Sequence, residues 1–121
     1  MTKTFCVSIT HSKDDPDAAT VGFVVANAAL GSEKDTLVFL STEGVWCAVK
    51  GAVDGVQVGE PFAPLASLVA KFVAGGGRIL VCTPCLKKRG IAEERLVAGA
   101  KPAGGAALVE FLANGAPCVC Y

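Results

Sequence analysis

The segment Thr36-Leu37-Val38-Phe39-Leu40-Ser41 holds four consecutive apolar residues and no charged side chain. A strand with water on one face alternates apolar and polar residues, so an unbroken apolar run indicates a strand buried on both faces, as in parallel sheets. Further strands are predicted at residues 4–10, 78–82 and 117–121, with a brief one within 97–101.

Helical patterns occupy the intervals between these strands. The first is predicted over residues 18–30, with Asp15 as its N-cap, Pro16 in its first turn and Gly31 as its stop. Others are predicted at residues 43–50, 65–74, 91–97 and 105–113. Because strands alternate with helices, we expect one α/β domain over residues 1–121, with a parallel sheet and helices on both faces.

The composition excludes several classes of protein. Hydrophobic residues make up 52% of the 121 residues and charged residues 18%, which is incompatible with a disordered chain. Eleven basic and eleven acidic residues cancel, so no overall field attracts the chain to nucleic acid or to a membrane. The apolar excess favours a sheet covered on both faces or a subunit interface.

The sequence also predicts a compartment. There is no apolar run of about 20 residues that could span a membrane, and the start resembles no secretory signal. We therefore expect a cytoplasmic protein with reduced thiols. Its six cysteines then serve packing, catalysis or metal binding rather than a disulfide framework.

Ligands of open parallel sheets bind beyond the carboxyl ends of the strands. That rule selects three groups of residues before any motif is considered, and these groups include the single histidine, the single tryptophan and the single Cys-x-x-Cys sequence. They are His11, Ser12 and Lys13 after the first strand, Thr42, Glu43, Gly44 and Trp46 after the second, and Cys82, Thr83, Pro84 and Cys85 after the third.

The cysteine pair lies beside a concentration of positive charge. Residues 78–101 contain six basic and two acidic side chains, and Lys87, Lys88 and Arg89 directly follow the pair. Nearby cations stabilise a thiolate, the reactive form of cysteine, so we predict a functional Cys82 rather than an inert buried one. A zinc site formed with Cys118 and Cys120 is the less favoured alternative, and packing is the default for Cys6 and Cys47.

The glycine clusters predict no nucleotide cofactor. Gly75-Gly76-Gly77 precedes a strand, whereas a phosphate-binding loop follows one and opens a helix. We expect neither a cofactor nor a resident metal.

Two segments resemble the DsrE/DsrF/TusD-like sulfur-relay family. One is Cys82 followed eight residues later by Gly90, with Lys87-Lys88-Arg89 before that glycine; the other is Phe39-Leu40-Ser41-Thr42-Glu43-Gly44-Val45. The first strand, its alanine-rich helix and a last strand around Cys118 are also similar. The resemblance implies a three-layer α/β/α fold, a five-stranded mainly parallel sheet and a homotrimer or hexamer.

The same resemblance implies that Cys82 carries sulfur as a persulfide between donor and acceptor proteins, in the manner of a sulfurtransferase. Cys85 departs from the single cysteine of relay proteins, and it could discharge a persulfide by forming a disulfide with Cys82. A dithiol oxidoreductase is therefore the main alternative, and a non-catalytic metal- or metabolite-binding subunit is the third. In the leading hypothesis the basic run favours the thiolate or docks a partner, and the pocket is lined by His11, Ser12, Glu43, Trp46, Thr83 and Pro84.

Overall fold

A computed structural model describes residues 3–121 of the chain. Met1 and Thr2, at the start that we compared with secretory signals, lie outside the described residues. The strands are β1 (Thr4–Ile9), β2 (Asp35–Leu40), β3 (Arg78–Cys82), β4 (Ala100–Ala103) and β5 (Cys118–Cys120). The helices are α1 (Pro16–Gly31), α2 (Leu65–Ala74), α3 (Thr83–Lys88) and α4 (Gly105–Ala113), with 3-10 segments η1 (Thr42–Ala48) and η2 (Glu93–Arg95).

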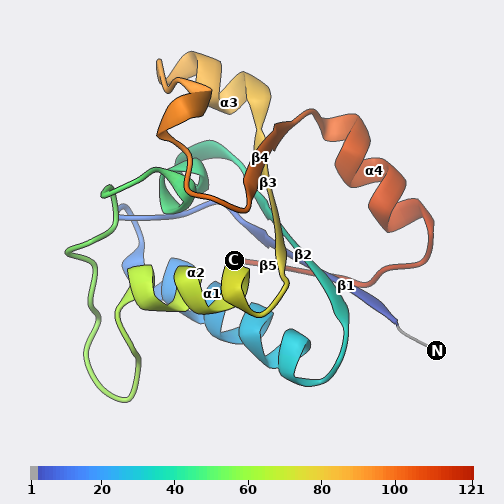
Figure 1. Cartoon of the computed structure of the whole chain (residues 1–121), viewed down its shortest axis with the longest axis horizontal. Helices are drawn as coiled ribbons and strands as arrows, with labels where there is room; N and C mark the ends of the chain where they lie inside the picture. Colours follow the sequence, from blue (N-terminus) through green and yellow to red (C-terminus); the bar gives the residue numbers. More distant parts are fainter. Residues whose placement is uncertain (1–2) are drawn as a thin grey trace.

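The strands form one five-stranded sheet in the order β4-β3-β2-β1-β5, and every neighbouring pair is parallel (Figure 1). The predicted fold class is thereby confirmed. The unbroken apolar strand is β2 at the centre, where five of its six residues are buried. No helix among the described residues is long and apolar enough to cross a membrane.

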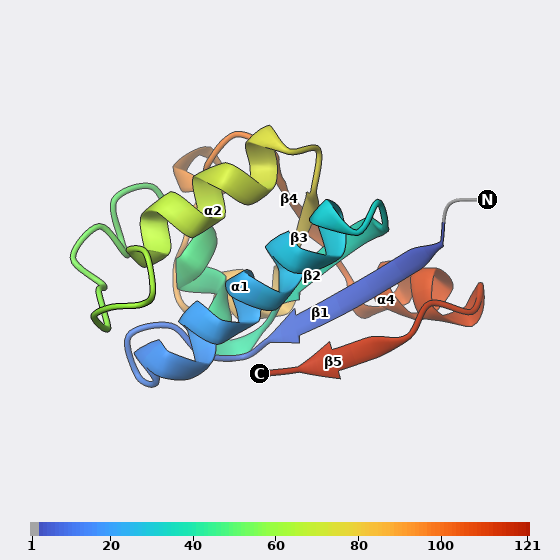
Figure 2. The ribbon, with the colours of Figure 1, turned by 90° about the horizontal axis from the view of Figure 1, so that it is seen from below.

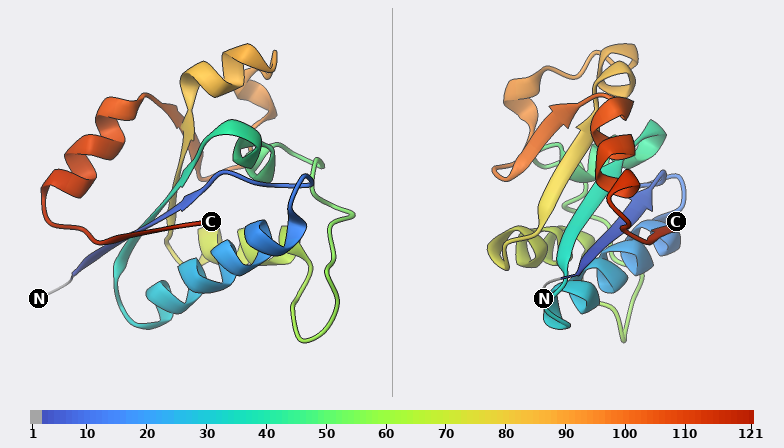
Figure 3. Two further views of the ribbon diagram at one scale, coloured as in Figure 1. Left: turned by 180° about the vertical axis from the view of Figure 1, so that it is seen from behind. Right: turned by 90° about the vertical axis from the view of Figure 1, so that its right-hand side faces the viewer.

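The direction of each connection decides which face a helix covers. Crossovers between parallel strands are right-handed, so the steps from β1 to β2 and from β2 to β3 put α1 and α2 on one face. The return from β4 to β5 runs the other way across the sheet, and α4 covers the opposite face (Figures 2 and 3). The result is the expected arrangement of three layers.

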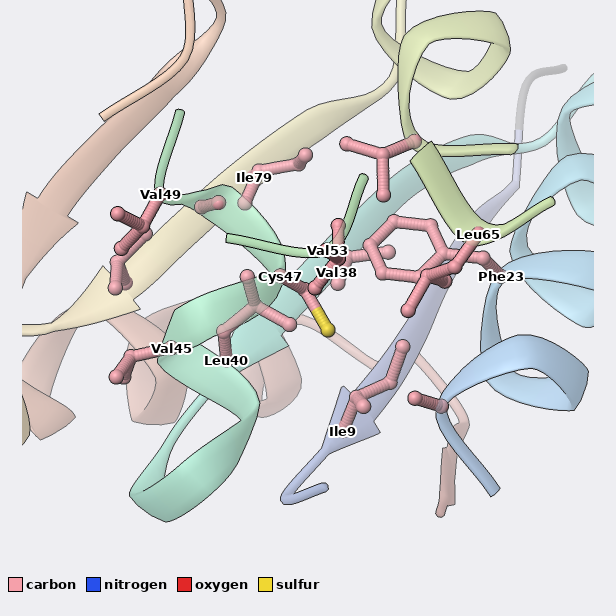
Figure 4. Close-up of a cluster of buried hydrophobic side chains, with 14 of the residues drawn as sticks. Ile9, Phe23, Val38, Leu40, Val45, Cys47, Val49, Val53, Leu65 and Ile79 are labelled. Carbon is pink, nitrogen blue, oxygen red and sulfur yellow. The ribbon is translucent and has the colours of Figure 1, made fainter. Parts of the chain in front are cut away.

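The main core lies between the sheet and the α1–α2 layer. Apolar side chains from the strands and both helices fill it, and Phe23 of α1 meets Phe72 of α2 edge to face with ring centroids 6.0 Å apart. Figure 4 shows Cys47 of η1 with its sulfur inside this cluster. The opposite layer is thinner, because α4 contains no fully buried residue and the Val109 side chain is 62% exposed.

The structure corrects several boundaries. In place of the α-helix predicted over residues 43–50 there is the 3-10 segment Thr42–Ala48, and only Glu93–Arg95 of the helix predicted over 91–97 is helical. The second difference has a tertiary cause: the Val97 N–H donates to the Ala48 carbonyl and the Lys50 N–H to the Arg95 carbonyl, which holds this segment extended against η1. Gly31 remains inside α1, and Glu33, at φ 61°, is the left-handed residue after it.

Both edges of the sheet are short strands. β4 has four residues, of which Pro102 lacks a backbone N–H, and β5 has three. The brief strand expected within 97–101 is β4, which begins inside that range at Ala100 and extends beyond it to Ala103.

Position 44 requires glycine because two backbone segments approach each other closely there. A Cβ atom at this position would lie 2.1 Å from the carbonyl oxygen of Ile9, the last residue of β1. No side chain fits there, so glycine is what allows η1 to pack against the carboxyl end of β1. Gly31 at the end of α1 is the opposite case, because a Cβ there would meet no atom within 4 Å.

We predict that Gly44→Ala lowers the free energy of unfolding by about 1–3 kcal/mol or more, since the backbone cannot yield as a side chain does. Gly31→Ala is the matched control and should be neutral or stabilising by about 0.5–1 kcal/mol, because it restricts the unfolded chain without a clash. Urea denaturation followed by circular dichroism measures both. Equal stability of the Gly44→Ala variant and the parent would contradict the steric argument.

Candidate functional site

The cysteine pair lies at the carboxyl end of the sheet, where the carboxyl-end rule placed it. Cys82 is the last residue of β3 and the N-cap of α3, and Pro84 follows in the first turn. Cys85 lies in the same turn, and both cysteines are partly exposed. Proline suits a first turn because its φ is already helical and its missing N–H would have had no partner.

The surroundings shift the pKa values of the two thiols in opposite directions. Burial, followed by a hydrogen bond with Cys85, raises the pKa of Cys82. Burial alone would also raise the pKa of Cys85, but hydrogen bonds from Cys82 and from the Thr42 N–H, with the charges of Arg89 and Lys88, hold it below its ordinary value. The pKa directions therefore favour Cys85 as the thiolate and Cys82 as the protonated partner.

Thr42 supplies the hydrogen bond that comes from outside the cysteine segment. Its backbone N–H lies 3.2 Å from the Cys85 Sγ, and its hydroxyl donates to the Thr10 carbonyl at 2.8 Å. Thr42 has φ 51°, which is rare for a β-branched residue and costs about 1–3 kcal/mol. The sequence placed Thr42 at a strand end but gave it no role, because no local pattern reveals a left-handed threonine.

Arg89 ties the cysteine segment to η1. Its Nε donates to Glu43 Oε2 at 2.8 Å and its Nη1 to the Cys85 carbonyl at 3.2 Å, and its side chain is only 16% exposed. The predicted basic run thus divides by position: Arg89 and Lys88 lower the pKa of Cys85, whereas Lys87 is exposed and absent from the causes of that shift.

Only part of the predicted pocket comes together. Ser12, Glu43 and Trp46 line one pocket, but His11, Thr83 and Pro84 are not among its lining residues. His11 instead pairs with Asp14, with Nδ1 and Oδ2 2.6 Å apart, and this hydrogen bond raises the pKa of the imidazole.

Cys118 and Cys120 are far from the pair. Two strands, β2 and β1, separate β3 from β5, which corresponds to about 14 Å at the usual strand spacing. The zinc site with Cys118 and Cys120 is therefore not formed, and among residues 3–121 no three His, Cys, Asp or Glu side chains are arranged to hold a metal. Burial raises the pKa of both Cys6 and Cys47 to about 12, in keeping with the packing roles predicted for them.

Comparison with known proteins agrees with this architecture. The model of the DsrE/DsrF-like family matches residues 3–119. The chain belongs to this family. DsrE-like proteins are linked in general to sulfur relay. The cysteine pair of this member lies beyond the carboxyl end of β3, at the end of the sheet where ligands of parallel folds bind.

Three relatives illustrate the range of this DsrE-like fold. The chain is 30% identical over 105 residues to an uncharacterised protein of Methanocaldococcus jannaschii. The aligned region makes up 87% of this chain but only 38% of the relative, which is the longer protein. The crystal structure of the ychN protein of E. coli matches the whole of both chains at 15% identity with a TM-score of 0.72. A protein of unknown function from Methanobacterium thermoautotrophicum matches 98% of this chain and 99% of its own at 11% identity, with a TM-score of 0.73.

We predict that iodoacetamide alkylates Cys85 faster than Cys82 at neutral pH, because its lower pKa leaves more of it as thiolate. Arg89→Gln should slow Cys85 alkylation several-fold by removing a stabilising charge, whereas Lys87→Gln should leave it unchanged. Peptide mapping of quenched reactions across a pH series gives the rate at each thiol. Faster labelling of Cys82 than of Cys85 in the parent would show that the two thiols are ordered the other way.

Proposed function

We propose that this chain carries sulfane sulfur as a persulfide on the Cys82–Cys85 pair and passes it to an acceptor protein. The hydrogen bond from the Thr42 N–H to the Cys85 sulfur is the observation that carries the proposal. It favours a thiolate at a partly exposed position, which is what attack on a sulfur donor needs. Membership of a family linked to sulfur relay gives independent support.

The first step uses the thiolate of Cys85. It attacks the outer sulfur of a donor R–S–SH, the donor's S–S bond breaks, and the donor leaves as a thiol after taking up a proton. Cys85 then holds the sulfur as a persulfide. Cys82, which the sequence favoured as the carrier, lies beside it with a pKa that burial raises.

The second step depends on which sulfur Cys82 attacks after losing its proton. Attack on the outer sulfur moves the persulfide to Cys82, and the chain acts as a carrier in the way that the family resemblance implies. Attack on the inner sulfur forms the Cys82–Cys85 disulfide and releases hydrosulfide. That second route is the chemistry of a dithiol oxidoreductase, and the position of both partly exposed cysteines in one turn of α3 keeps it as the second candidate.

We predict that inorganic polysulfide adds the mass of one sulfur atom to the parent protein. Cys85→Ser should slow this addition, because burial raises the pKa of Cys82 and leaves less of it as thiolate. Cys82→Ser should keep fast addition and lengthen the lifetime of the persulfide, since no second thiol remains to attack it. Intact-mass spectrometry over time, followed by peptide mapping, measures each quantity.

Cys118→Ser is the control for removal of an accessible thiol, because Cys118 is exposed and lies on β5, away from the pair. It should leave the rate of addition at the pair unchanged. No sulfur adduct on either Cys82 or Cys85 in the parent would end the carrier proposal. Adduct loss with formation of a Cys82–Cys85 disulfide and hydrosulfide would favour the oxidoreductase instead.

The proposal extends to partners. Lys87 is exposed near the pair and is not among the groups that lower the pKa of Cys85. We assign it to docking an acidic surface on a donor or acceptor protein. We also propose that the chain forms a homo-oligomer, a trimer or hexamer, in the reducing cytoplasm. Support comes from α4, an apolar helix without a fully buried residue, and from its exposed Val109.

Sedimentation equilibrium should therefore give a mass that is a multiple of 12.3 kDa at micromolar concentration. Val109→Glu should shift the population toward the single chain, because a charge would have to be buried in the interface. Gln57→Glu, at an exposed loop position, is the matched control and should not. A mass of one chain for the parent would refute this part of the proposal.

A further inference from the structure

The pocket lined by Ser12, Glu43 and Trp46 adjoins the cysteine site without including either cysteine. Its volume is about 370 Å³, and it lies beyond the carboxyl ends of β1 and β2. The residues around it come from four segments that are distant in sequence; they are Ser12, Lys13, Glu43, Trp46, Ala52 and Arg95. The turn that holds Glu43 also holds Thr42, whose N–H contacts the Cys85 sulfur, so the pocket and the thiol site share one turn.

The charge in this pocket is positive. Lys13 and Arg95 form no ion pair with any residue in the described part of the chain. Glu43, the carboxylate of the lining, is already paired with Arg89 at 2.8 Å. The carboxylates nearest in sequence to Lys13 are also engaged, because Asp14 pairs with His11 and Asp15 caps α1. Within the described chain, two cations without an ion-pair partner therefore face the pocket, and the carboxylate of its lining is engaged by Arg89.

The walls add an aromatic surface and a hydroxyl group. The Arg95 guanidinium carbon lies 5.9 Å from the centre of the Trp46 ring, and Ala52 adds apolar surface. Ser12 is 1% exposed, and its hydroxyl has no nitrogen or oxygen partner among residues 3–121, only the Cys47 sulfur beside it. The neighbouring Cys47 thiol donates instead to the His11 carbonyl at 3.5 Å. Sulfur is a weak acceptor, so this buried hydroxyl is poorly satisfied, and a ligand could accept its hydrogen bond.

We propose that this pocket binds a small organic anion, a carboxylate or sulfonate attached to a flat apolar body. The anionic group lies between Lys13 and Arg95, and the apolar body lies against Trp46 and Ala52. This arrangement matches the usual composition of small-molecule sites, where apolar walls supply contact area and a few polar groups orient the ligand. Binding at this pocket requires no sulfur chemistry, so it stands or falls separately from the persulfide proposal.

Trp46 makes the test direct, because it is the single tryptophan of the chain and its fluorescence reports on this pocket. We expect benzoate and benzenesulfonate to change that fluorescence saturably. Neutral benzyl alcohol, which has the ring without the charge, should bind at least about tenfold more weakly. Sulfate, which has the charge without the ring, should also bind more weakly. Isothermal titration calorimetry gives a second measure of each affinity.

Arg95→Gln and Lys13→Gln should each weaken benzoate binding about tenfold or more. Arg78→Gln is the matched control, because Arg78 also lies over an aromatic ring, with its guanidinium carbon 5.2 Å from the centre of Phe111, but away from this pocket. It should leave the affinity unchanged. Absence of saturable binding by both methods, equal affinity for benzyl alcohol and benzoate, or an unchanged affinity in Arg95→Gln would each overturn the proposal.

Discussion

The contact between the turn after β2 and the end of β1 organises the functional end of the molecule. It exists because Gly44 has no side chain, so that its backbone can approach the Ile9 carbonyl more closely than any Cβ would permit. With η1 held there, Thr42 adopts a left-handed conformation and directs its N–H to the Cys85 sulfur. Glu43 then reaches Arg89, which fixes the orientation of α3. The lowered pKa of Cys85 thus depends on the absence of a side chain at Gly44, which is distant from it in sequence.

The parallel sheet could be predicted from the sequence because its evidence is local. β2 is apolar along its length, α1 has its capping aspartate and proline, and α4 has the predicted bounds. The predictions were wrong where long-range contacts override local propensity. The segment around Glu93–Arg95 has helical residues, yet its backbone pairs with residues 48–50 and stays mostly extended. η1 is likewise constrained by β1, which no pattern in residues 43–50 reveals.

The site shows the same division. The carboxyl-end rule and the Cys-x-x-Cys motif identified the cysteine pair, Glu43 and Trp46 because strand ends are visible in the sequence. The difference between the two thiols was not visible, because it depends on a donor 43 residues away and on the placement of Arg89. His11 was grouped with the pocket for its position after β1, but its short contact with Asp14 holds it elsewhere. Arg95 could not be connected with Lys13 from sequence, since only the fold brings these residues to one pocket.

The two edges of the sheet restrict how copies of this chain can associate. A continuous intermolecular sheet needs an edge strand with a full set of free N–H and C=O groups. At one edge Pro102 removes a donor from a strand of four residues, and at the other β5 provides only three residues. Strand addition is therefore weak at either edge, and the molecule is protected against open-ended, fibre-like growth. Contacts between copies of this chain would have to use its helical surfaces, where side chains rather than backbone groups determine the geometry.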